Sequence, residues 1–183
     1  SIKDGIKYKA ESCLHFHPDR EIILDGNNIF IDQNIKIEYF IELIDDLKPY
    51  VTIKYPSDNF KIDEAYTKGI NPCHLAINER NDFLVAVNYT SGDFSSYKVS
   101  SEGKLTFIEQ ITHNGSSVNI NRQREPHAHS INFLDNNSFY VCDLGVDKIF
   151  YYQIDPNSYK IIKTNFTNTK PGSGPRHFIL NKQ

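Results

Sequence analysis

Short apolar runs separated by polar turns fill the chain from Gly69 onward, and their order repeats once. The first copy has apolar-rich segments at 75–77, 83–87, 94–99 and 104–108. The second copy has them at 130–133, 139–142, 148–154 and 159–164. Runs of this length, rich in β-branched and aromatic residues and bounded by Gly, Asn, Asp and Ser, predict β-strands. Four short strands repeated about every fifty residues indicate the blades of a β-propeller.

Polar residues recur at matching places in the repeat. His74 precedes Asn88 by fourteen residues, and His129 precedes Asp143 by the same interval. A third copy begins around His177, where a loop at 171–176 leads into an expected strand at 177–180. A blade needs neighbours to bury its faces. We therefore expect the chain to be a fragment, or to be completed by residues 1–65 or by another chain.

The first 65 residues follow the repeat less clearly. Apolar residues at helical spacing predict a helix over 35–47: they are Ile37, Phe40, Ile41, Ile44 and Leu47. Strands are expected at 21–24 and 50–55, with a turn at 25–28. The alternative is a degenerate blade with Cys13 in the position of the repeated histidine. The sequence thus predicts a mainly β protein with two parts, an N-terminal segment (1–65) and a partial propeller (66–183).

Composition narrows the possible functions. The 183 residues are 39% hydrophobic, carry a formal net charge of -3 and have no basic cluster, which argues against a nucleic-acid partner. No apolar run is long enough to span a bilayer and no leader opens the sequence, so a cytoplasmic, membrane-free setting is expected. Cys13, Cys73 and Cys142 lack metal-site or disulfide spacing and are interpreted as small buried hydrophobes.

Histidines that open the innermost strands of successive blades would face a central channel, where they are candidates for chemistry. His74, His129 and His177 occupy such positions, although His74 lies among apolar neighbours that also suit a packed, hydrogen-bonded histidine. His127 lies two residues before His129, so both share a face of an extended strand. A neutral imidazole there suits a general base. The alternative is that the pair only satisfies backbone groups.

Arginines near these histidines suggest an anionic ligand. Arg176 follows Gly172-Ser173-Gly174-Pro175, where small residues permit close approach, and Arg122 lies in the loop before His127. A guanidinium binds carboxylate or phosphate through paired hydrogen bonds and stabilises a developing oxyanion. No third ligand is spaced to join His127 and His129, so no metal and no cofactor are expected.

Seven motifs from residue 69 to residue 183 occur together, in order, in one family. They are Asn-Pro-Cys-His at 71, Val-Ala-Val-Asn-Tyr at 85, Gly-Ser-Ser-Val-Asn at 115, Arg-Gln at 122, Pro-His-Ala-His-Ser at 126, Cys-Asp-Leu-Gly-Val-Asp-Lys at 142 and Gly-Ser-Gly-Pro-Arg-His-Phe at 172. This part of the chain resembles the lactonase family of seven-bladed β-propellers, which includes 6-phosphogluconolactonases and 3-carboxy-cis,cis-muconate lactonizing enzymes.

The resemblance implies an active site at the channel mouth, without metal or cofactor. Matched by motif, His129 and Arg176 would be catalytic, and His127, Arg122, His74 and His177 would bind the substrate. The family's glutamate lies one strand beyond the arginine, and this sequence ends before that position.

The expected partner is a small anionic lactone, and 6-phosphogluconolactone is the first candidate, which would place the chain in the pentose phosphate pathway. One alternative is a 3-carboxy-cis,cis-muconate cycloisomerase. Another is a non-catalytic fragment or ligand-binding module, completed by another chain or copy.

Overall fold

Every regular element in the described part of the chain is a β-strand. The computed structural model describes residues 24–25, 28–29, 38–44, 48–54 and 61–179, with side chains from Asp63 onward. In chain order the strands are β1 (Leu24–Asp25), β2 (Asn28–Ile29), β3 (Glu38–Ile44), β4 (Lys48–Lys54), β5 (Lys61–Tyr66), β6 (Pro72–Ile77), β7 (Phe83–Asn88), β8 (Asp93–Val99), β9 (Leu105–Thr112), β10 (Ala128–Asp135), β11 (Ser138–Asp143), β12 (Lys148–Ile154) and β13 (Ile161–Asn168).

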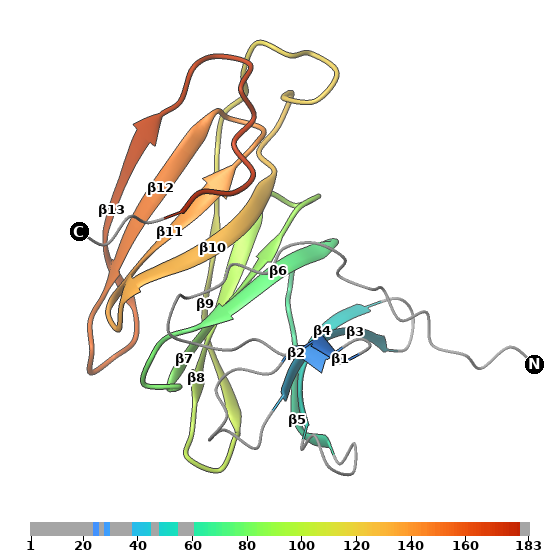
Figure 1. The fold of residues 1–183 in the computed structure, drawn as a ribbon, viewed down its shortest axis with the longest axis vertical. Helices are drawn as coiled ribbons and strands as arrows, with labels where there is room; N and C mark the ends of the chain where they lie inside the picture. The colour runs from blue at the N-terminus through green and yellow to red at the C-terminus, as the bar shows by residue number, and fades with distance from the viewer. Residues whose placement is uncertain (1–23, 26–27, 30–37, 45–47, 55–60, 180–183) are drawn as a thin grey trace, which may run out of the picture.

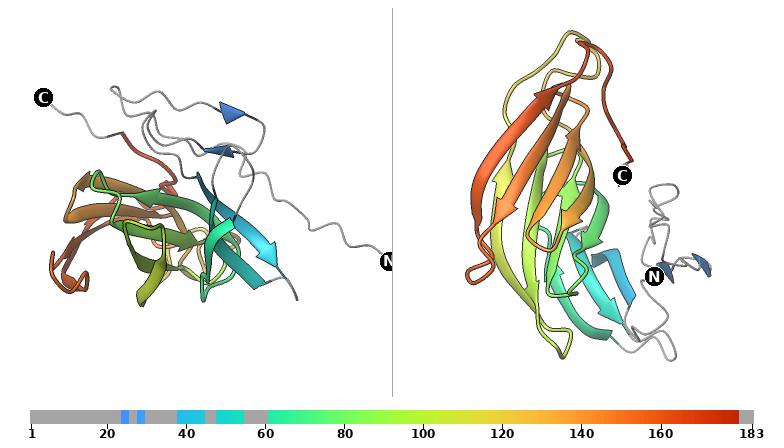
Figure 2. Two further views of the ribbon diagram at one scale, coloured as in Figure 1. Left: turned by 90° about the horizontal axis from the view of Figure 1, so that it is seen from below. Right: turned by 60° about the vertical axis from the view of Figure 1, so that its left-hand side comes forward.

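Two four-stranded antiparallel sheets confirm the predicted repeat. Strands β6 to β9 form the first, here called the first blade, and β10 to β13 form the second blade. In both, each strand pairs with the next along the chain, as in a propeller blade. The two blades lie face against face (Figures 1 and 2), and β10 of the second contacts β6 and β7 of the first.

The predicted helix over 35–47 is wrong where the structure describes it. Residues Glu38–Ile44 form strand β3, which pairs with β4 and through it with β5 in a three-stranded antiparallel sheet. The segment Glu-Tyr-Phe-Ile-Glu-Leu-Ile alternates as well as it fits a helical period, and it is rich in the aromatic and β-branched residues that favour strands. The apolar residues thus fit both the helical and the strand repeat, and pairing with the neighbouring strand β4 decides for the strand.

The structure agrees with two other predictions for the N-terminal part. The strand expected at 50–55 is part of β4, and β1 pairs with β2 around the turn predicted at 25–28. Residues 21–23, Cys13 and Tyr55 lie outside the described residues.

The apolar core lies between the two blades. Alternate residues of β7 point to opposite faces: Phe83, Val85 and Val87 pack toward the second blade, whereas Leu84 and Ala86 pack on the other side. Both sets are fully buried, which explains why β7 reads as an uninterrupted apolar run. On the second blade the core contains Ile131, Phe139, Val141, Phe150, Tyr152 and Ile154. Aromatic rings interlock there, with Phe94 meeting Tyr152 edge to face at 4.9 Å between centroids.

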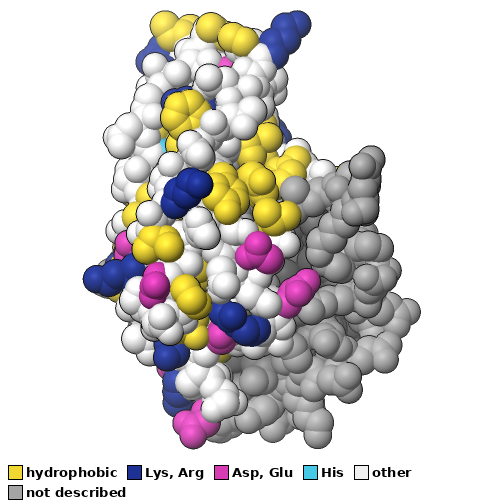
Figure 3. Space-filling model, turned by 90° about the vertical axis from the view of Figure 1, so that its left-hand side faces the viewer, with side chains coloured by type: hydrophobic (Ala, Val, Ile, Leu, Met, Phe, Trp, Pro, Cys, Tyr) yellow, Lys and Arg dark blue, Asp and Glu magenta, His cyan; other side chains and the backbone are white. Residues whose placement is uncertain are grey.

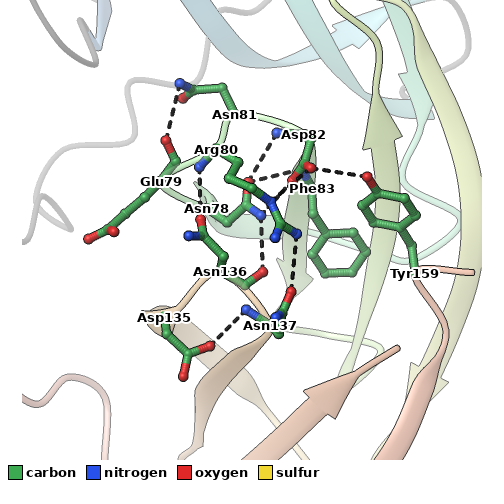
Figure 4. A network of polar contacts seen from close by, with 10 residues as sticks. All are labelled: Asn78, Glu79, Arg80, Asn81, Asp82, Phe83, Asp135, Asn136, Asn137 and Tyr159. Carbon is green, nitrogen blue, oxygen red and sulfur yellow. Dashed lines mark hydrogen bonds and ion pairs between the residues drawn. The ribbon is translucent and has the colours of Figure 1, made fainter. Parts of the chain in front are cut away.

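Equivalent turns of the two blades are also joined by polar contacts (Figure 4). The Arg80 backbone N–H donates to Asn136 Oδ1 at 2.8 Å, and its guanidinium donates to Asn137 Oδ1 at 3.1 Å. The Tyr159 hydroxyl donates to Asp82 Oδ2 at 3.0 Å. These bonds fix the lower rim of the blade pair, at the opposite end from the histidines described below.

The strand expected at 177–180 does not form over 177–179, which are described. This segment has no strand neighbour in the described part of the chain, and extended backbone needs such pairing to become a strand. Instead it packs on the second blade through Phe178, whose ring meets Tyr140 edge to face at 5.5 Å.

The face of the second blade nearest β13 carries apolar and charged side chains side by side (Figure 3). Ile162 and Phe166 on β13 are 61% and 52% exposed. Among the described residues, no helix has the length and apolar character to cross a bilayer.

Candidate functional site

His129 is the extra residue of a β-bulge at the start of β10. Ala128 pairs with Asp143 and Ser130 pairs with Cys142, which leaves His129 without a cross-strand partner. In the first blade the extra residue of the register shift is Cys73, between Pro72 and His74. Bulges re-aim side chains beside active sites. By pairing register His129 therefore matches Cys73, one residue away from the match with His74 that the spacing predicted.

The three histidines singled out in the sequence converge at one end of the blades. The rings of His129 and His177 meet edge to face, with centroids 5.0 Å apart and planes at 85°. The His74 ring is also near His177, at 6.4 Å between centroids. Its Nδ1 also accepts a long hydrogen bond, 3.4 Å, from the Ile131 backbone N–H. His74 thus joins the cluster and packs against β10 at the same time.

His127 is held by Tyr89, which the sequence analysis did not single out. The two rings stack at 4.5 Å between centroids and 10° between planes. The His127 Nδ1–H donates to the Tyr89 carbonyl at 3.0 Å. Tyr89 also meets His129 edge to face at 5.8 Å, and its hydroxyl accepts a 3.4 Å hydrogen bond from Arg122. Tyr89 therefore links His127, His129 and Arg122.

Asp143 fixes the backbone that leads into the bulge. Its Oδ1 accepts hydrogen bonds from the backbone N–H groups of His127 at 2.7 Å and Gly145 at 2.8 Å. Its Oδ2 lies 2.6 Å from His113 Nδ1, which donates because a carboxylate accepts. The carboxylate is fully buried and has a partner for each oxygen.

The buried Asp143–His113 pair resembles a catalytic dyad in its geometry, but its contacts stabilise the fold. Burial raises the pKa of the Tyr152 phenol, so its hydroxyl stays protonated and donates to His113 Nε2 at 2.8 Å. His113 is 4% exposed and stacks on Phe150 at 3.9 Å between centroids. Both ring nitrogens are occupied within the core, so the imidazole has no free position for a substrate.

The electrostatic setting keeps His129 neutral. Burial, the neighbouring His177 and the positive charge of Arg176 lower the pKa of the imidazole to about 4, and Arg122 adds to this effect. The residue's own backbone carbonyl acts in the opposite direction and is outweighed. No other described residue hydrogen-bonds to Nδ1, which is buried. At neutral pH the ring therefore has a lone pair available.

The arginines are exposed at the edge of this cluster. Neither Arg176 nor Arg122 is buried, yet both are close enough to His129 to influence its pKa. Arg176 follows Gly172 and Gly174, which both adopt positive φ values, 82° and 52°. Such values favour glycine, which explains the small residues in this loop. All six predicted site residues thus lie in one cluster with Tyr89, and their roles remain predictions.

No metal-binding cluster is found within the described residues, where three His, Cys, Asp or Glu side chains never gather in a suitable geometry. Cys142 is a free thiol. Burial raises the pKa of the Cys142 thiol to about 11, although the nearby Ser130 side chain acts the other way. This supports the interpretation of Cys142 as a small buried side chain; Cys13 lies outside the described residues.

The antiparallel four-stranded blades, packed face to face with histidines at one end of their inner strands, define a β-propeller protein. The family model described as "Lactonase, 7-bladed beta-propeller" matches residues 51–183. The chain belongs to this family.

Its relatives include proteins named for one activity. A 6-phosphogluconolactonase of Formosa agariphila is 37% identical over 119 residues, covering 62% of this chain and 34% of that protein. One of Bacillus subtilis is 28% identical over 162 residues, covering 85% of this chain and 46% of that protein. The crystal structure of a putative 6-phosphogluconolactonase from Bacteroides fragilis superposes with a TM-score of 0.72 and 25% identity, over 82% of this chain and 46% of that one. The chain spans less than half the length of these relatives.

Proposed function

We propose that this chain supplies the histidine and arginine of a lactone-hydrolysing site, and that its substrate is 6-phosphogluconolactone. The observation that carries the proposal is the pairing of a neutral, half-buried His129 with cationic groups on two loops. Lactone opening needs a base that takes a proton from the attacking water, and a positive charge that stabilises the oxyanion formed. The names of the two 6-phosphogluconolactonases similar to this chain support the choice of substrate.

His129 is the proposed general base. It takes a proton from water as the water oxygen attacks the lactone carbonyl, and a tetrahedral oxyanion forms. The carbon–oxygen bond of the ring then breaks, and the imidazolium returns the proton to the leaving alkoxide. A base with a pKa of about 4 is weak in the free site. A bound anion would offset the positive charge of Arg176 and Arg122, and so would raise this pKa toward neutrality.

Arg176 is the proposed partner for negative charge. Arg176 is exposed and close enough to His129 to lower its pKa, and paired N–H donors suit a carboxylate, a phosphate or a developing oxyanion. Arg122 and His177 are proposed to bind the phosphate, and His127 and His74 to line the substrate site. Tyr89, which stacks on His127 and accepts from Arg122, adds an aromatic wall.

The test compares two lactones on the same protein. The rate of ring opening is followed for 6-phosphogluconolactone and for unphosphorylated gluconolactone, with the wild-type chain and with Arg176→Ala. We expect the wild type to prefer the phosphorylated lactone by at least about tenfold, and Arg176→Ala to open both lactones more slowly. A wild-type rate equal to that of spontaneous hydrolysis would contradict the proposal.

A non-catalytic ligand-binding role is the second candidate, because the exposed Arg176, Arg122 and His177 beside His129 would also hold an anion that is not turned over. Calorimetric titration with 6-phosphogluconate, the product of the proposed reaction, separates the two. Product binding without lactone opening would support the binding role.

We further propose that residues 66–183 form the propeller part, that β3 to β5 add a blade, and that another chain or copy completes the ring. The supporting observation is the outward face of the second blade, where Tyr140 contacts both Tyr151 and Phe178. Sedimentation equilibrium checks this: a mass of a single 21.1 kDa chain would contradict completion by a second copy. A cytoplasmic location, proposed because Cys142 is a free thiol, is checked by cell fractionation.

A further inference from the structure

One carboxylate, that of Asp147, holds two loops at the candidate site. Its Oδ2 accepts hydrogen bonds from the Gly172 backbone N–H at 2.6 Å and the Ser117 hydroxyl at 2.5 Å. Its Oδ1 accepts from the Gly174 backbone N–H at 2.7 Å and lies 3.5 Å from the Ser173 hydroxyl. Asp147 is only 4% exposed. A buried carboxylate with two partners for each oxygen forms strong, charge-assisted bonds.

The first of these loops carries Arg176. Asp147 holds its start as well, since the Asp147 carbonyl accepts both the backbone N–H and the hydroxyl of Thr169, at 2.8 and 3.0 Å. The loop lies tightly on the turn that contains Asp147, because a Cβ added to Gly174 would come within 3.2 Å of Leu144 Cγ. Among the described residues, no hydrogen bond or ion pair holds the Arg176 guanidinium itself. Its position therefore depends on the backbone that Asp147 anchors.

The second loop carries Arg122. Ser117, which donates to Asp147, also donates its backbone N–H to the Gln123 carbonyl at 2.8 Å. That bond closes the turn containing Arg122, and the Gln123 side chain fixes it to the Leu144 carbonyl at 2.8 Å. Asp147 thus ties together the two loops whose arginines act on His129, although it lies on the turn between β11 and β12.

We propose that Asp147 is a positioning residue, which clamps both arginine loops so that Arg176, His177 and Arg122 stand around His129. The effect on catalysis rests on the proposed lactonase function, whereas the effect on placement does not. Asp147→Asn is the informative change, because one carboxylate oxygen becomes an NH2 group. An NH2 group only donates, so it would face the N–H and O–H donors that the carboxylate oxygen accepted.

The turn between β12 and β13, at the other end of the second blade (Figure 1), offers a matched control. There Asp155 Oδ1 accepts the backbone N–H groups of Asn157 at 3.0 Å and Ser158 at 2.7 Å, and also the Ser158 hydroxyl at 3.0 Å. Asp155→Asn removes the same negative charge from a turn far from the histidines, but its amide oxygen still accepts these bonds, since all three end on one oxygen. An effect of lost negative charge alone would appear in both variants, whereas an effect of lost loop bonds concerns only Asp147.

The readout is the titration of the His129 imidazole in the folded full chain, followed by NMR without any substrate. The groups that face this ring are His177, Arg176, Arg122 and Tyr89. In Asp147→Asn the two arginine loops should move away from His129. The midpoint of the His129 titration should then rise from about 4 by at least about one unit, a tenfold change in proton affinity. Asp155→Asn should leave it at the wild-type value.

Gly174→Ala provides a second variant that leaves the buried carboxylate intact. Its Cβ would press on Leu144 at a positive φ of 52°, so the loop alone should shift and His129 should again bind its proton more tightly. An unchanged His129 titration in both Asp147→Asn and Gly174→Ala would overturn the proposal. Since no lactone is present, this result is independent of the proposed function. If the chain opens lactones, Asp147→Asn should also raise KM for the phosphorylated substrate more than for the neutral one.

Discussion

His129 and His177 meet edge to face with ring centroids 5.0 Å apart, although they belong to successive repeats of the chain. Two imidazoles at this distance repel each other when both carry a proton, so protonation of one disfavours protonation of the other. His177 is among the groups that lower the pKa of His129. The geometry thus keeps one histidine in its basic form at neutral pH.

Removal of the Arg176 charge should raise the pKa of His129. Arg176 lowers this pKa by disfavouring a second positive charge nearby, so Arg176→Ala should raise the midpoint by about half a unit. Arg124→Ala is the control: it also removes one exposed charge, but Arg124 Nε donates to the Ile120 carbonyl at 2.7 Å and does not act on His129. An equal rise in both variants would point to net charge alone. NMR titration of the ring provides the measurement.

Stability should fall in mild acid because of the same histidine. In the unfolded chain His129 binds a proton below about pH 6.5, whereas in the folded chain it does so only near pH 4. The unfolded state therefore gains protons first, and stability is lost as the pH drops from 6.5 to 4. We expect about 1–2 kcal/mol over this window after solvent screening. Denaturant unfolding at several pH values measures it.

The variant His129→Gln should remove most of the fall in stability between pH 6.5 and pH 4. Asp147 also titrates abnormally: burial opposes its ionisation, but hydrogen bonds from Ser117, Gly172 and Gly174 prevail and lower its pKa below 3.8. Its stabilising contribution is therefore lost only at lower pH, outside the window of His129. A slope between pH 6.5 and 4 that survives His129→Gln would refute the assignment.

Gly145→Ala should destabilise the protein strongly. An added Cβ would collide with the Glu125 carbonyl and lie 2.8 Å from the His127 nitrogen, so the backbone that leads to the bulge must move. We expect a cost of about 3 kcal/mol in the free energy of unfolding. Gly115→Ala is the comparison, because there the nearest atom is Val146 Cγ1 at 3.4 Å and the main cost is a φ of 121°. Equal costs would show that the close approach at Gly145 is unimportant.

His74→Ala should change the lactone-opening rate by less than about fivefold. By pairing register His74 is not the equivalent of His129, and its Nδ1 accepts from the Ile131 backbone. Loss of that contact should lower stability by about 1 kcal/mol. A loss of activity as large as that of His129→Ala would reassign the base.

The strands from β6 to β13 could be predicted because their periodicity, turn residues and repeat agree with one another. Segment 38–44 was mispredicted because its apolar residues fit two periods, and only the pairing with β4 decides between them. The strand expected after His177 depends on a neighbouring strand, which local sequence does not reveal.

The clustering of the candidate site residues was predicted in part. Residue types and spacing brought His129, Arg176 and His177 forward, and the fold brings them together. The bulge that separates His129 from His74 is a matter of register, which histidine spacing alone misplaced by one residue. Tyr89 and Asp147 were missed because their roles come from contacts between loops far apart in sequence. The only available signal was their presence in the motifs Val-Asn-Tyr and Asp-Leu-Gly-Val-Asp.

The most direct measurement is the initial rate of 6-phosphogluconolactone opening by the wild-type chain and by His129→Ala, each verified as folded by its circular dichroism spectrum. Loss of a general base should slow the reaction by about 100-fold or more, with little change in the amount of folded protein. A His129→Ala protein that opens the lactone as fast as the wild type would contradict the central claim.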